Sequence, residues 1–150
     1  MTNTELSPED HFAAHCSGVG GKDFSDDDDD YHQPPWLFRI AFAPTIENPH
    51  VSGLWVEREG EAFADQLNRL REELIASTRT IRKSHQLAVV KVGTINRLGQ
   101  RHSRNLHVIY SPDQERRLPS HSEIRGIQQE DRILQQKIAD NAEIHPIYPA

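Results

Sequence analysis

The chain has one cysteine, Cys16, among its 150 residues. A lone thiol cannot form an internal disulfide, and it excludes zinc sites that are built from several cysteines. Long apolar runs are lacking as well, because no stretch approaches the roughly 18 residues of a membrane-spanning helix. The N-terminus does not have the basic and then apolar layout of a secretory signal. These absences predict a cytoplasmic protein with no membrane partner.

Charge is distributed unevenly along the chain. The whole sequence has a net charge of -6, but residues 1–34 alone hold nine acidic residues and one basic residue, with five of the acids in the run Asp26–Asp30. Glycines and the pair Pro34-Pro35 accompany this run, and such a composition cannot bury enough apolar surface to offset the entropy of ordering. We therefore expect a disordered acidic tail over 1–35 and a single α+β domain over 36–150.

Hydrophobic patterning predicts the elements of the first half of this domain. A dense apolar run predicts a strand over 36–43, and a second short run over 51–56 is either a strand that pairs with the first or the approach to the next helix. Apolar residues at steps of three, four and seven predict a helix over 59–82. The first half is therefore expected to supply up to two strands and one amphipathic helix.

The second half is predicted from two β-branched runs and a capping motif. The runs 87–92 and 106–110 flank a segment with a glycine, so they are expected to form a hairpin with a basic tip. Ser120 and Glu123 have the spacing of a capping box, which predicts a helix over 120–142. A short strand over 144–148 follows. Without the uncertain element at 51–56, the order is β-α-β-β-α-β, which favours a small two-layer sandwich of ferredoxin-like order.

Seven basic residues and no acidic residue lie between Leu74 and Pro112. Arginine and lysine contact phosphates, so this segment predicts a binding surface for nucleic acid or an acidic protein surface. The other interpretation is that these charges keep exposed strand edges soluble. The predicted binding residues are Arg79, Arg82, Lys83, Lys91, Arg97, Arg101, His102 and Arg104.

The acidic tail offers a second use of this basic surface. Five aspartates on a flexible segment would compete with an anionic partner for the same arginines, which would regulate binding. The alternative is an acidic segment that only keeps the protein soluble.

Nine histidines raise the alternative of an enzyme. His107, His121 and Glu123 are the candidates for a histidine- or metal-assisted phosphoesterase or nuclease, with Arg125 or Arg104 on the phosphate. No HExxH, GxxxxGK[ST] or GxSxG motif supports this reading. His11, His15 and Cys16 have helical spacing that predicts adventitious metal affinity rather than a functional site. The first prediction is a binding or regulatory protein without catalysis, metal or cofactor.

The last predicted helix suggests protein contacts. Ile124, Ile127, Leu134 and Ile138 form one apolar stripe, and Ile133 lies off it. A second apolar position predicts a homodimer through this helix, or an accessory subunit that acts through protein contacts. A surface helix with a single apolar face against the sheet explains the same stripe without a partner.

Overall fold

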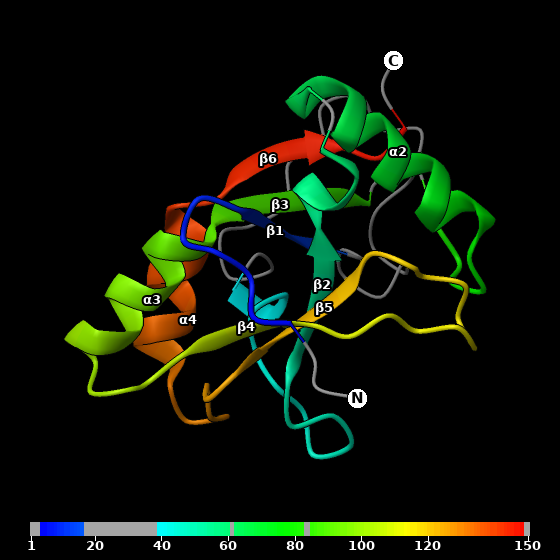
Figure 1. Cartoon of the computed structure of the whole chain (residues 1–150). Helices are drawn as coiled ribbons and strands as arrows, with labels where there is room; N and C mark the ends of the chain where they lie inside the picture. The colour runs from blue at the N-terminus through cyan, green and yellow to red at the C-terminus, as the bar shows by residue number, and fades with distance from the viewer. Residues whose placement is uncertain (1–3, 17–38, 61, 83–84, 149–150) are drawn as a thin grey trace, which may run out of the picture.

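The computed structural model describes residues 4–16, 39–60, 62–82 and 85–148. They form a six-stranded antiparallel sheet in the order β4-β5-β2-β1-β3-β6 (Figure 1). The strands are β1 His11–Cys16, β2 Val51–Trp55, β3 Gln86–Lys91, β4 His107–Tyr110, β5 His121–Arg125 and β6 Glu143–Pro146. The helices are η1 Val56–Glu59, α2 Phe63–Ala76, α3 Val92–Arg101 and α4 Arg132–Asp140. None of the helices in these described ranges has the length and apolar character that crossing a membrane requires.

Strand β1 occupies the middle of the sheet, between β2 and β3. The prediction of a tail was therefore wrong for residues 11–16, and so was the helical turn expected there, because Phe12, Ala13, Ala14 and Cys16 are all buried. The ring of Phe12 packs so closely over Gly53 of β2 that a Cβ at Gly53 would lie 2.2 Å from it. Both faces of this strand are buried, so its sequence does not alternate between polar and apolar residues, and the pairing with β2 and β3 is what identifies it. The aspartate run Asp26–Asp30 lies outside the described residues.

Helices cover both faces of the sheet, so the domain has three layers instead of the expected two. Successive side chains of β1 and β3 point to opposite faces of the sheet. Phe12 and Val90 lie in the core between the sheet and the helices α3 and α4, whereas Ala13 and Val89 lie in the core between the sheet and α2. The helices bury Ile95, Leu98, Leu134 and Ile138 on the first face and Leu67, Leu70 and Leu74 on the second. Burial on both faces explains the unbroken apolar run of β3.

The predicted hairpin over 87–110 does not form. Both strands exist as β3 and β4, but the segment between them is the helix α3, and the two strands are not neighbours in the sheet. Val92, Ile95 and Leu98 recur at helical spacing and are buried on one side of α3. Gly99 permits close packing rather than a turn, because a Cβ there would lie 2.6 Å from Leu106.

The predicted helix over 120–142 was wrong at its start. Residues 121–125 form β5, which pairs with both β2 and β4, and the helix α4 begins only at Arg132. The expected strand over 36–43 was also wrong where it is described, since residues 39–43 form a helical turn with Arg39 O accepting from Phe42 N. Helix α2 confirms a helix within the predicted range 59–82, and β6 confirms the terminal strand. The run over 51–56, whose type the sequence left open, forms the strand β2 and the start of η1. The α+β class is confirmed, but the strand order is not ferredoxin-like.

Candidate functional site

A cavity of about 290 Å³ lies where β1 and β2 separate. β1 pairs with β2 only at Phe12 and Ala13, whereas its pairing with β3 continues to Cys16. The polar side chains that line the cavity come from the end of β1, the 45–52 region and the segment after α2: His15, Thr45, Asn48, His50, Ser52 and Arg79. None of the described residues that line it is an aspartate or a glutamate.

Arg79 brings a positive charge into this cavity without a carboxylate partner. Its Nη1 lies 3.3 Å from Nδ1 of His15, and no carboxylate in the described part of the chain lies within ion-pair distance of it. Burial lowers the pKa of Arg79, as does the charge of Arg116, while Asp113 opposes them. Asp113 is engaged by Arg116 at 2.8 Å. A buried charge without a counter-charge is costly, so an anion at this position would be stabilised.

The hydrogen-bond chain behind Arg79 defines the tautomer of His15. Arginine can only donate, so Nδ1 of His15 is the acceptor and its proton lies on Nε2. That Nε2–H then donates to Nδ1 of the buried His85, 3.0 Å away. Burial, with help from Arg79 and His85, lowers the pKa of His15 to about 3. His15 is therefore a neutral acceptor that orients the guanidinium and leaves its charge uncompensated.

Three further side chains offer donors to the cavity. Nδ1 of His50 is buried and has no hydrogen-bond partner among the described residues. The backbone N–H of Asn48 donates to the hydroxyl oxygen of Thr45 at 2.9 Å, and its Nδ2 donates to the hydroxyl oxygen of Ser52 at 3.0 Å. Because both hydroxyl oxygens act as acceptors in these bonds, each hydroxyl keeps its own proton to donate. With Arg79, these groups form a donor set suited to an oxyanion.

Cys16 also lines this cavity, but its chemistry differs. Burial raises the pKa of the Cys16 thiol to about 12. Because the thiolate is the nucleophilic form of cysteine, this thiol is not an activated nucleophile near neutral pH. The cavity is therefore equipped to bind rather than to form a covalent intermediate on sulfur.

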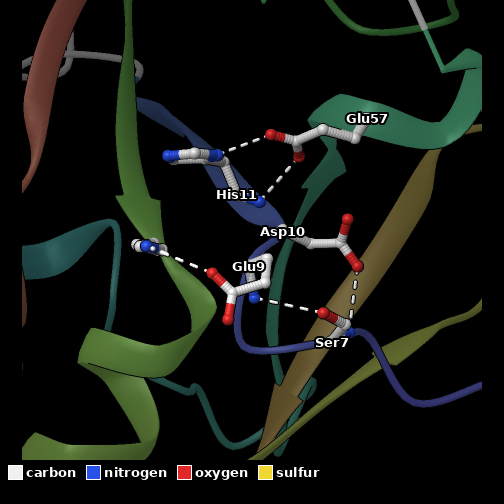
Figure 2. A network of polar contacts seen from close by, with 6 residues as sticks. Ser7, Glu9, Asp10, His11 and Glu57 are labelled. Atoms are coloured by element: carbon white, nitrogen blue, oxygen red, sulfur yellow. Dashed lines mark hydrogen bonds and ion pairs between the residues drawn. The ribbon is translucent and has the colours of Figure 1, made fainter.

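A second polar cluster holds the beginning of β1. Figure 2 shows the Glu57 carboxylate between two donors of His11, accepting from its backbone N–H at 2.7 Å and lying 2.5 Å from its Nδ1. Glu9 pairs with Lys91 of β3 at 3.4 Å. In the same view, the backbone N–H of Ser7 donates to the carboxylate of Asp10. These contacts fasten the start of β1 against η1 and β3, which places His15 four residues further along the strand. The cluster thus holds one end of β1 in place, while His15 and Cys16 at the other end line the cavity.

The structure divides the predicted basic surface. Arg79 and the exposed Arg82 lie just before β3, whereas Lys91 ends β3 and contacts Glu9 at 3.4 Å. Arg97 and Arg101 are exposed on α3, which lies on the far side of the sheet from α2 (Figure 1). His102 caps α3.

Arg104 and Lys83 complete the set of predicted binding residues. Arg104 is held by Asp131 through two bonds of 2.9 and 2.8 Å, so its guanidinium already has a carboxylate partner. Lys83 lies outside the described residues.

The alternative catalytic residues each have a partner of their own. His107 contacts Glu5 at 2.6 Å, Nδ1 of His121 lies 2.7 Å from the Ser111 carbonyl oxygen, and Glu123 accepts from Arg125 at 2.7 Å. His107 lies opposite Arg125, so His121 lies four residues further along β5, about 13 Å away at the rise of a strand. Across the described ranges, no three His, Cys, Asp or Glu side chains gather to hold a metal ion.

The metal affinity expected from the spacing of His11, His15 and Cys16 does not match the strand that they form. Successive side chains of a strand point to opposite faces, so His15 and Cys16 cannot hold one ion together. The spacing would bring the three side chains together only on a helix, and this segment is a strand.

Sequence reasoning missed His15, Thr45, His50 and Ser52 as site residues. They come from two distant segments and carry no shared motif, so only the separation of β1 from β2 brings them around one cavity. No protein-family model, no curated protein and no solved structure matches this chain.

Proposed function

We propose that this protein binds an anionic partner, and that a negative group of the partner enters the cavity beside Arg79. The observation that carries the proposal is the partly buried guanidinium of Arg79, which contacts a neutral histidine and has no carboxylate partner among the described residues. An anion would supply the missing counter-charge and accept from the donors of the cavity. The proposed role is binding or regulation, without a chemical step.

Nucleic acid is the partner class that we propose. Arg82 is exposed three residues after Arg79 in the chain, so it adds a second positive charge to the same segment. Phosphates are the groups that arginines contact in protein–nucleic acid interfaces, and each neutralised phosphate releases counterions. The acidic run Asp26–Asp30 would compete for the same charges and so regulate binding.

The test is fluorescence anisotropy with a labelled single-stranded oligonucleotide at several salt concentrations. Arg79→Gln removes the charge but keeps a hydrogen-bonding group, and we expect it to weaken binding about tenfold or more, the worth of a charge-assisted hydrogen bond. The matched control is Arg132→Gln, which removes one exposed arginine from α4. It is expected to change the affinity by much less.

Two results would overturn the proposal. Equal losses in Arg79→Gln and Arg132→Gln would show that net charge, not the cavity, determines binding. Failure of the intact protein to bind single- or double-stranded DNA or RNA at low salt would exclude nucleic acid, and a poly-glutamate peptide would then test the acidic-protein alternative. Circular dichroism of both variants establishes that they are folded.

A further inference from the structure

We infer that the group bound beside Arg79 is a phosphomonoester, with its phosphate as the innermost part of the ligand. This inference rests on the proposed function, because it names the chemistry of the anion that the same cavity takes. Three observations carry it: the number of donors, the charge around Arg79 and the size of the cavity.

The cavity has more hydrogen-bond donors than the two oxygens of a carboxylate require. Arg79, Thr45 and Ser52 each have hydrogen to donate, and His50 lines the cavity with an Nδ1 that has no partner among the described residues and donates when it carries the ring proton. A carboxylate has two oxygens in one plane, and an arginine fork by itself satisfies both. A phosphomonoester has three terminal oxygens arranged as a tetrahedron, so it also accepts from the imidazole and the hydroxyls. A ligand with more oxygens accepts from more of these donors at once, which favours the phosphomonoester.

The charge around the cavity favours a dianion. The positive charge of Arg116 acts on Arg79, and the carboxylate of Asp113 opposes it. Asp113 is itself paired with Arg116 at 2.8 Å, and the exposed Arg82 adds a positive charge to the segment that carries Arg79. A phosphomonoester carries a charge of roughly -1.5 to -2 near pH 7, whereas a carboxylate carries a single charge. A phosphodiester also carries only one, and just two of its oxygens are free to accept.

The size of the cavity favours a terminal group. Its volume of about 290 Å³ is at the lower end for ligand cavities, and it accommodates a phosphate with a small attached group. Ile40, Ala41 and Ala43 supply an apolar part of the lining for the carbon atoms of that group. A diester would have to leave the cavity in two directions, whereas a monoester leaves in one.

Three small probes test this inference by shift titration of backbone and histidine NMR signals: glycerol 3-phosphate, dimethyl phosphate and acetate at equal ionic strength. We expect glycerol 3-phosphate to bind at least about tenfold more tightly than either other probe, with the largest shifts at His50 and Ser52. Arg79→Gln should abolish this preference. Thr45→Val with Ser52→Ala should weaken glycerol 3-phosphate severalfold and leave acetate unchanged, and Arg132→Gln serves as the charge control.

An oligonucleotide pair separates failure of the inference from failure of the proposed function. We expect a strand with a 5′-phosphate to bind more tightly than the same strand with a 5′-hydroxyl. Equal binding of the two strands and of all three small probes would overturn the phosphomonoester and leave an anion-binding protein. Binding of glycerol 3-phosphate without binding of either strand would overturn the nucleic-acid partner and support the phosphomonoester. If neither the small probes nor the strands shift any signal, the phosphomonoester inference and the proposed function are both wrong.

Discussion

The guanidinium of Arg79 and the imidazole of His15 lie 3.3 Å apart, and in this pair the arginine donates to a histidine that is neutral. A carboxylate at the position of His15 would cancel the charge of Arg79. A neutral acceptor orients the guanidinium instead and leaves its charge to an incoming anion. The function that we propose depends on this relationship.

The first prediction concerns the pH dependence of stability. Burial lowers the pKa of His15 to about 3 in the folded protein, whereas an unfolded chain takes up this proton near pH 6.5. The unfolded state therefore binds more protons as the pH falls below about 6.5, so the free energy of unfolding falls too. We expect this residue to contribute a loss of about 1.5 kcal/mol between about pH 6.5 and about pH 5, measured by urea unfolding.

The variant His15→Asn tests this assignment. Its amide oxygen retains an acceptor for Arg79, and its stability should be lower at neutral pH but less dependent on pH. His107→Asn, which removes the partly exposed imidazole of β4, is the control that should keep the dependence of the wild type. Parallel curves for His15→Asn and the wild type would show that His15 is not held neutral.

The second prediction assigns Arg104 to stability rather than binding. Burial raises the pKa of Asp131, but hydrogen bonds from Arg104 and from the Gln128 N–H outweigh it and hold this pKa below its usual value. Arg104→Ala leaves this carboxylate short of its partner, so we expect urea to unfold this variant at a lower concentration than the wild type. Arg101→Ala, on the exposed side of α3, should cost less than about 0.5 kcal/mol. Equal stability of the two variants would refute this role.

The third prediction concerns the two arginines of α3. Arg97 and Arg101 lie far from the cavity, so only a long strand can contact both regions. We expect Arg97→Gln with Arg101→Gln to flatten the salt dependence for a long oligonucleotide and to leave a short one unaffected. Anisotropy with both lengths makes the comparison. An equal effect on the short strand would place the arginines of α3 at the main site.

The fourth prediction concerns the acidic run. Replacement of Asp26–Asp30 by asparagine removes five negative charges from the chain, so the affinity for an anionic partner should rise, most strongly at low salt. Deletion of residues 1–34 would not test this role, because it would also remove the central strand β1. The control is replacement of Asp140 and Glu143, two acids at the other end of the chain. An unchanged affinity in the asparagine variant would leave the run with a solubilising role alone.

The fifth prediction concerns self-association through α4. Ile133 is 68 % exposed on this helix, and we expect weak dimers to form through it at high concentration. Ile133→Asp should abolish them in sedimentation velocity. Ile46→Asp makes the same change at a side chain that is 90 % exposed in the segment before β2, and it should leave the dimer intact. A wild-type protein that stays monomeric at every concentration would end this hypothesis.

Local patterns predicted the elements whose signal lies within one segment. The period of Leu67, Leu70 and Leu74 identified α2, and β-branched runs identified β3 and β4. Local patterns gave the wrong element where the same residue type occurs in two kinds of structure. Gly99 indicated a turn but allows Leu106 to approach α3, and Glu123 indicated a helix cap but pairs with Arg125 on a strand.

The sequence by itself determined the acid-free basic segment, the α+β class and the absence of any internal disulfide, because these follow from composition and local period. Only the tertiary structure decided that β1 lies at the centre of the sheet and that Arg79, His15 and His50 line one cavity. Strand pairing and burial join segments that are far apart in the chain, and no local pattern records which segments will meet. The charge of Arg79 was visible in the sequence, but only the fold shows that none of the described carboxylates pairs with it.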